Sequence, residues 1–296
     1  MSSVPKNINC GGERLSLKQF DPERLHCNNK GEYVNPRIAI VAKSGSGKSW
    51  VIRDIMYHLR NIPSGCVIAP ADKYEKFYDE FIPSIFKHDE MDLSIMHQVI
   101  NRQKMIIEKN EERITKGNPP LDTRAFLIMD DCMADGAKWV KEPITREIFF
   151  QGRHFGLTFI LSMQYIIGIG PELRSNFDFI FLLAEDSFLN RKKIYEGYAS
   201  IFPNFDIFDQ VFTQVTDDYG CMVIDKREKS NDITKKVFWY KAKKRDDFKV
   251  GSEKIWKFNE LNYDQNYMKK TPLLDLNNYV GGRKNKPQII VQKNNI

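Results

Sequence analysis

The chain has 296 residues, of which 28% are charged and 42% are hydrophobic, as is typical of a folded globular protein. This length suffices for one large α/β domain with additions, or for two modest domains. No apolar run approaches the ~20 residues of a membrane span, and no signal peptide is recognisable at the N-terminus, so we expect a protein of the cytosol or nucleus. The five cysteines are scattered without CxxC spacing, and we expect no protein-ligated transition metal.

Charge is distributed unevenly along the chain, whose net charge is +6. The segment from Lys226 to the end carries 18 Lys and Arg against 8 Asp and Glu, whereas residues 1–225 carry 27 against 31. A basic segment of this kind favours a polyanion partner. A charged, solvated surface is the alternative.

Residues 1–36 are polar and weakly periodic. We expect an N-terminal extension that packs on the core with a short edge strand and a helical turn. The apolar side chains available for this packing are Leu15, Leu17, Phe20 and Leu25.

The most informative stretch is 37–49, which reads as a short buried strand, a Gly/Ser loop and the start of a helix. A phosphate-binding P-loop has this context, because its glycines let successive N–H groups face one anion. Lys48 would contact the β- and γ-phosphates of ATP, and the Ser49 hydroxyl would coordinate Mg²⁺. A Gly/Ser loop with a chance Lys is the alternative. The predicted nucleotide-binding residues are Ala42, Lys43, Ser44, Gly45, Ser46, Gly47, Lys48, Ser49 and Trp50.

One residue departs from the full P-loop pattern. The pattern begins with Gly, and this chain has Ala42 in that place. Alanine permits the tight turn only if its φ stays negative.

The run 123–131 reads as a second buried strand, and it ends in two carboxylates. This is the Walker B pattern, in which Asp130 would hold the Mg²⁺ and Asp131 would orient or deprotonate the attacking water. Strands often end in acidic residues, so the pattern is weak alone. Its position about eighty residues after a P-loop makes it strong.

The run 157–164 reads as a third buried strand, ending in Ser-x-Gln. In P-loop ATPases with an inserted strand between the Walker A and Walker B strands, a polar residue at this place contacts the γ-phosphate. Gln164 fits that role. A polar strand end that faces solvent is the alternative.

The order of the predicted elements favours an α/β fold, a doubly wound and mainly parallel sheet of the P-loop NTPase type with a C-terminal β-hairpin. Nucleotide would bind at the carboxyl ends of the strands. Besides the three strands above, we predict strands over 66–69 and 177–184, helices over 49–61, 90–107, 144–154, 187–202 and 205–216, an irregular aromatic stretch at 77–83, a solvated helix end and loop over 109–118, and a hairpin from 219–224 and 237–241.

With these motifs the chain resembles the FtsK–HerA superfamily of DNA-pumping ATPases, whose core is of the RecA/FtsK-like additional-strand type. Within it, the chain is similar to the poxvirus-type genome-packaging ATPases of large DNA viruses. The Walker motifs are generic. The specific parts are Phe-Tyr-Asp-Glu-Phe-Ile-Pro at 77–83, Gly-Arg-His-Phe-Gly-Leu at 152–157 and Ser-Met-Gln at 162–164, and the resemblance covers about residues 15–242.

The resemblance implies a ring of identical subunits, a pentamer or hexamer, in which each ATP site receives an arginine from the neighbouring subunit. Arg153 matches that arginine best and Arg174 is second, and a surface salt bridge is the alternative for both. Implied partners are double-stranded DNA and capsid or inner-membrane proteins at the packaging vertex. The implied location is the host cytoplasm, in a viral factory, or the virion.

On this interpretation the chain divides into an N-terminal extension (1–36), a P-loop ATPase domain (37–242) and a basic, partly mobile C-terminal segment (243–296). The favoured function is ATP-driven translocation of DNA into a viral capsid. Two alternatives stay open. One is a nucleotide or polynucleotide kinase, although no compact Arg-rich lid is visible. The other is a nucleotide-switched scaffold that binds capsid or membrane proteins, which Ala42 and the short Asp131 leave possible.

Overall fold

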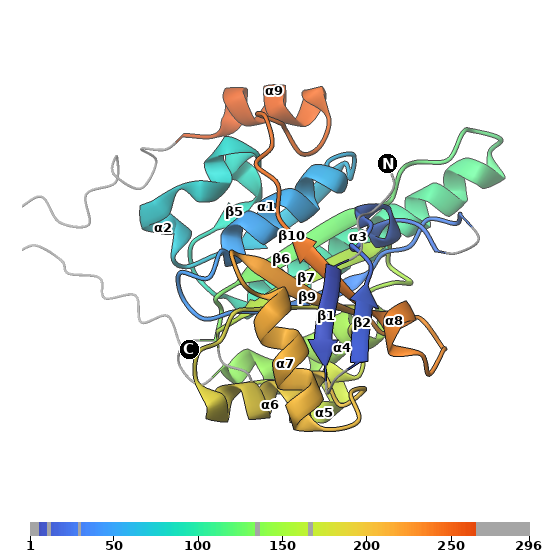
Figure 1. Cartoon of the computed structure of the whole chain (residues 1–296). Helices are drawn as coiled ribbons and strands as arrows, with labels where there is room; N and C mark the ends of the chain where they lie inside the picture. The colour runs from blue at the N-terminus through green and yellow to red at the C-terminus, as the bar shows by residue number, and fades with distance from the viewer. Residues whose placement is uncertain (1–5, 11–12, 29–30, 134–136, 165–167, 265–296) are drawn as a thin grey trace, which may run out of the picture.

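The computed structural model describes residues 6–10, 13–28, 31–133, 137–164 and 168–264, and the structural statements below concern this part of the chain. Eight strands form one sheet in the order β10-β9-β8-β3-β7-β6-β4-β5 (Figure 1). The six strands from β8 to β5 are parallel, and β9 is antiparallel to both β8 and β10. The strands are β3 (Arg37–Val41), β4 (Ser64–Ile68), β5 (Lys87–His88), β6 (Ala125–Asp130), β7 (Leu157–Met163), β8 (Phe179–Leu183), β9 (Gly220–Asp225) and β10 (Val237–Lys241).

This topology confirms the predicted fold class. Strand β7 lies between β3, which leads into the P-loop, and β6, which ends in the two carboxylates. It is the inserted strand that the sequence predicted. The hairpin is also present as β9 and β10, joined by a connection that contains the short helix α8 (Ile233–Lys236).

Helices cover both faces of the sheet, which is why every residue of β3, β6, β7 and β8 is buried. Along β3, Ile38 and Ile40 pack with α1 on one face, and Ala39 and Val41 pack with α3, α4, α6 and α7 on the other. The helices are α1 (Lys48–His58), α2 (Asp72–Glu75), α3 (Leu93–Thr115), α4 (Pro143–Gln151), α5 (Pro171–Arg174), α6 (Phe188–Tyr198), α7 (Phe205–Val215) and α9 (Glu253–Asn262).

Two helices differ from the prediction. Helix α3 continues to Thr115, through a charged stretch that we had predicted as a helix end and loop. Lys, Glu and Arg are good helix formers, and a solvated helix end needs no apolar periodicity. Helix α9 was not predicted, because its exposed, mostly polar sequence resembles that of a loop.

The N-terminal residues form a hairpin of their own, β1 (Lys6–Cys10) with β2 (Glu13–Leu17), which Figure 1 shows beside α7. The predicted edge strand is therefore not part of the main sheet. The N-terminal segment pairs with the main sheet at one isolated bridge, between Gln19 and Trp239 of β10. The expected packing is present, since Leu17, Phe20 and Leu25 are buried.

Part of the C-terminal segment packs against α1. Asp54 of α1 is fully buried and accepts hydrogen bonds from the Tyr240 hydroxyl (2.6 Å), the Lys243 N–H (2.8 Å) and Arg245 Nε (2.6 Å). Val250 is buried on the same face. The three-part division of the chain stays a prediction, and the predicted mobile tail from Gly281 lies outside the described residues. No described helix is long and apolar enough to cross a membrane.

Candidate nucleotide-binding site

The predicted P-loop connects the carboxyl end of β3 to α1. Gly45 and Gly47 have φ values of +76° and +92°, a region that glycine adopts without strain. The Ser46 hydroxyl donates to the Lys43 carbonyl (2.7 Å) and closes the loop on itself. Gly47 is the N-cap of α1 and no side chain caps this helix, so its first N–H groups are available to an anion.

Ala42 meets the condition stated above, that its φ must stay negative for the tight turn to form. It is buried, its N–H donates to the Met163 carbonyl (3.0 Å), and it is absent from the described residues with positive φ. The alanine therefore continues the pairing of β3 with β7 and places no strain on the loop.

Lys48 and the two Walker B carboxylates converge at this edge of the sheet. Lys48 Nζ lies 3.1 Å from Asp130 Oδ1 and 4.0 Å from Asp131 Oδ2. Gln164, at the end of β7, donates from its amide to Asp131 Oδ2. Three parallel strands, β3, β6 and β7, thus bring together the four polar side chains that the sequence analysis assigned to the phosphates, the Mg²⁺ and the attacking water.

Two further residues hold Asp130, and sequence reasoning missed both roles. The Ser162 hydroxyl donates to Asp130 Oδ1 and accepts the N–H of Asp131 (3.2 Å), so it joins β6 to β7. The Tyr78 hydroxyl donates to Asp130 Oδ2 (2.9 Å). Burial, and then the nearby Asp130 charge, raise the pKa of Tyr78 well above its ordinary value, so this hydroxyl stays protonated and donates. The sequence does place the hydroxyl of Ser162 on the same strand end as Gln164, which could have indicated a role in the site. Nothing in the sequence pairs Tyr78 with Asp130.

The residues present fit a magnesium ion. The Ser49 hydroxyl and the Asp130 carboxylate are hard oxygen ligands of the kind that Mg²⁺ prefers. In the described part of the chain, no group of three or more His, Cys, Asp or Glu side chains could hold a metal. A cation here would therefore take most of its ligands from phosphate oxygens and water, as Mg²⁺ does in P-loop sites.

A cavity of about 910 Å³ opens over the P-loop. Seven of the predicted loop and helix residues line it, together with Asp130, Asp131 and Gln164. Residues that we had not predicted complete the lining: Val51, Ala71, Glu75, Phe77, Tyr219, Lys241, Ala242 and Lys244. The last four come from the ends of β9 and β10, a region in which the sequence shows no nucleotide-binding motif.

The two candidate arginines lie at the opposite edge of the sheet. Arg153 precedes β7 and Arg174 precedes β8, and both strands run parallel to β3. The five residues of β3, at ~3.3 Å each, put roughly 16 Å between that edge and the P-loop. Within one chain, neither arginine joins the cluster around Lys48.

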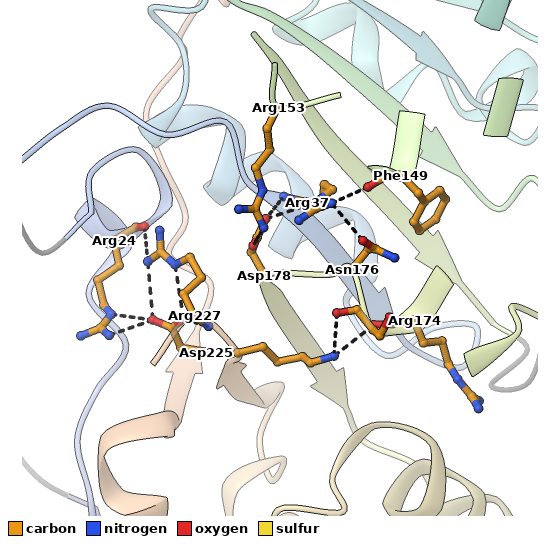
Figure 2. Close-up of polar contacts among 11 residues, drawn as sticks. Arg24, Arg37, Phe149, Arg153, Arg174, Asn176, Asp178, Asp225 and Arg227 are labelled. Carbon is orange, nitrogen blue, oxygen red and sulfur yellow. Dashed lines mark hydrogen bonds and ion pairs between the residues drawn. The ribbon is translucent and has the colours of Figure 1, made fainter. Parts of the chain in front are cut away.

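Figure 2 shows how Arg153 is held. Arg153 is half exposed and pairs with the buried Asp178, which also accepts the N–H of Arg37 (2.8 Å) at the start of β3. Arg174 lies over the ring of Tyr198, 5.4 Å from its centroid. The salt bridge that we weighed as the alternative for Arg153 is thus present. An arginine in such a pair can still contact a neighbouring subunit, because half of its side chain remains accessible.

Proteins of large DNA viruses are similar to this chain in sequence. The chain is 40% identical over 254 residues to uncharacterized protein L437 of Acanthamoeba polyphaga mimivirus, which covers 86% of each chain. It is 33% identical over 267 residues to uncharacterized protein 075L of Invertebrate iridescent virus 6, covering 87% of this chain and 98% of that one. The chain belongs to this viral family. No protein-family model matches it.

The comparison with solved structures bears on the fold of this chain. The conjugation coupling protein TcpA of pCW3, solved with ATPγS, superposes with a TM-score of 0.50 at 11% identity, over 80% of this chain and 65% of TcpA. B204, the DNA-packaging ATPase of Sulfolobus turreted icosahedral virus, gives a TM-score of 0.49 at 16% identity, over 71% of this chain and 99% of B204. At these identities the TcpA superposition bears on fold alone.

Proposed function

We propose that this protein is an ATP-hydrolysing DNA translocase that packages a double-stranded DNA genome into a viral capsid. The observation that carries the proposal is the convergence of Lys48, Asp130, Asp131 and Gln164 at the carboxyl edge of the sheet, beside an uncapped helix N-terminus. This arrangement is suited to a nucleoside triphosphate whose γ-phosphate is transferred to water.

Each side chain has a definite task in hydrolysis. Lys48 leaves its carboxylate partners and neutralises the β- and γ-phosphates, while Asp130 and Ser49 face the Mg²⁺ position. Asp130 and Ser49 are the residues that would hold Mg²⁺, which would supply positive charge to offset that of the phosphates. Asp131, held by Gln164, orients the attacking water or accepts its proton.

The packaging role is supported by the source of the relatives and by the sequence resemblance. The relatives are proteins of mimivirus and of iridescent viruses. The coupling protein TcpA shares the fold. On the motifs quoted above, we assign the chain to the poxvirus-type branch of the packaging ATPases, with the host cytoplasm or the virion as its location.

The position of Arg153 is compatible with the ring that the sequence resemblance implies. Its edge of the sheet faces away from the P-loop, so a head-to-tail contact between identical copies would bring Arg153 of one subunit to the ATP of the next. Head-to-tail contacts close into rings when the rotation allows it. We propose a pentamer or hexamer in which Arg153, or else Arg174, completes the neighbour's site. Capsid or inner-membrane proteins would anchor the ring at the packaging vertex.

Phosphate release with and without double-stranded DNA tests the proposal against its alternatives. A translocase hydrolyses ATP and is stimulated by DNA. A kinase would need an acceptor other than water, and a scaffold would bind ATP with little turnover. Lys48→Ala is the control, because it removes the charge that meets the phosphates. DNA-independent hydrolysis, or hydrolysis that survives Lys48→Ala, would overturn the proposal.

A further inference from the structure

The cavity over the P-loop is larger than a triphosphate needs, and it has two chemically different ends. The sheet order places β7 and β6 on one side of β3, and β8, β9 and β10 on the other. Gln164 and the Walker B carboxylates therefore mark the γ-phosphate end. Strand β9 begins and β10 ends at the same edge of the sheet as the P-loop. The opposite end of the cavity is therefore lined by residues from these two strand ends: Tyr219, Lys241, Ala242 and Lys244.

Tyr219 is held at this second end by an unusual turn. Asp218 and Tyr219 have φ values of +50° and +57°, a conformation that non-glycine residues seldom adopt and that persists only where the surroundings impose it. Lys241 of β10 forms an ion pair with Asp218 and ties the turn to the sheet. Gly220 follows, where a Cβ would lie 2.2 Å from the Val215 carbonyl oxygen, so the chain can reverse here only with glycine.

This turn brings the tyrosine ring to the P-loop. Tyr219 Cδ1 lies 3.5 Å from the position that a Cβ on Gly47 would occupy, yet 68% of the residue is exposed. Trp50, one residue beyond Ser49, lines the same cavity and is 48% exposed. Its indole meets Phe77 edge to face, at 6.2 Å between centroids. Two large aromatic side chains thus border one cavity without being buried in the core.

We propose that this end of the cavity binds the nucleobase of the nucleoside triphosphate, with the base stacked on Tyr219 and with Trp50 on the other wall. The inference rests on the proposed function and adds to it a site for the base. A flat π-system of a nucleobase fits exposed aromatic rings beside a phosphate-binding loop, since stacking uses the ring faces and tolerates different bases. The phenol oxygen of Tyr219 is not needed for stacking.

Equilibrium binding of ATP and of inorganic tripolyphosphate, which has no base, tests the proposal. Tyr219→Ala should weaken ATP binding by roughly 5- to 140-fold, the range expected for one lost stacking contact. The same variant should leave the affinity for tripolyphosphate unchanged. Tyr219→Phe keeps the ring and should bind ATP as the unmodified protein does. Tyr74→Ala is the matched control, because Tyr74 is 85% exposed and does not line the cavity.

The outcomes separate the two proposals. If the unmodified protein binds neither ligand, the proposed function itself fails. If it binds both, and Lys48→Ala weakens both, the triphosphate site is supported. An equal loss of both ligands in Tyr219→Ala, or no loss of ATP affinity, would then overturn the assignment of the base to Tyr219.

Discussion

Removing the hydroxyl of Tyr78 should leave the Asp130 carboxylate less firmly positioned, while the packing of the core stays unchanged. Tyr78 is fully buried, and its ring packs against Phe77 and Phe81 at 5.5 and 5.7 Å between centroids. Tyr78→Phe keeps these ring contacts and removes only the 2.9 Å hydrogen bond to Asp130 Oδ2. The variant therefore isolates one contact to the residue that we place at the Mg²⁺.

The size of the effect follows from the kind of bond that is lost. A hydrogen bond to a charged group contributes about 1.5–3 kcal/mol to stability. Asp130 borders the cavity, so water can replace the hydroxyl, and we expect the lower end, about 1.5 kcal/mol. For a chain of this size the melting temperature should fall by roughly 2–3 °C. A residue that orients a metal ligand typically contributes about tenfold or more to metal affinity, so the Mg²⁺ concentration for half-maximal hydrolysis should rise about tenfold.

Two measurements check this prediction. Thermal unfolding reports the stability change, and ATP hydrolysis across a Mg²⁺ titration reports the change at Asp130. Tyr74→Phe is the control, since Tyr74 is 85% exposed and should change neither. If Tyr78→Phe melts and titrates like the unmodified protein, the hydroxyl does not hold Asp130 and our description of the site is wrong.

Three further predictions concern turnover, assembly and DNA. Asp131→Asn should retain ATP binding and lose hydrolysis, because the substitution keeps the size of the side chain and removes the base. Normal turnover would mean that another carboxylate orients or deprotonates the attacking water. Arg153→Ala and Lys48→Ala subunits should each be inactive alone and regain activity when mixed, since loss of a trans arginine costs on the order of 10³–10⁵ in rate; mixed rings that stay inactive would refute Arg153 as that arginine. Truncation after Asp264 removes six Lys and Arg and one Asp, so DNA affinity should fall and its salt dependence should flatten; an unchanged slope would assign this charge to another role.

The sheet could be predicted because each of its main strands is a continuous apolar run followed by a motif. The run 37–41 leads into Gly-Ser-Gly-Lys-Ser, 125–129 into Asp-Asp, and 157–161 into Ser-Met-Gln. Strands buried on both faces read in this way, and the order of the motifs gives the inserted strand. Local sequence also set the start of α1, where a glycine N-cap and a lysine follow the loop.

Contacts between distant positions could not be predicted. Tyr78 and Asp130 are 52 residues apart, and an aromatic run with one tyrosine does not indicate which acid it will meet. Arg153 and Asp178 are 25 residues apart, and their pairing depends on β7 and β8 flanking β3. Tyr219 lies in a hairpin with no nucleotide-binding pattern. Its place in the cavity follows from the antiparallel strands at the sheet edge and from a left-handed turn that a single sequence does not show.

ATP-dependent displacement of a third strand from a DNA triplex tests the central claim most directly. A translocating ring that moves along the duplex should strip the third strand with ATP and Mg²⁺, and should fail to do so with a non-hydrolysable analogue or with Lys48→Ala subunits. Hydrolysis that is stimulated by DNA but leaves the triplex intact would contradict translocation.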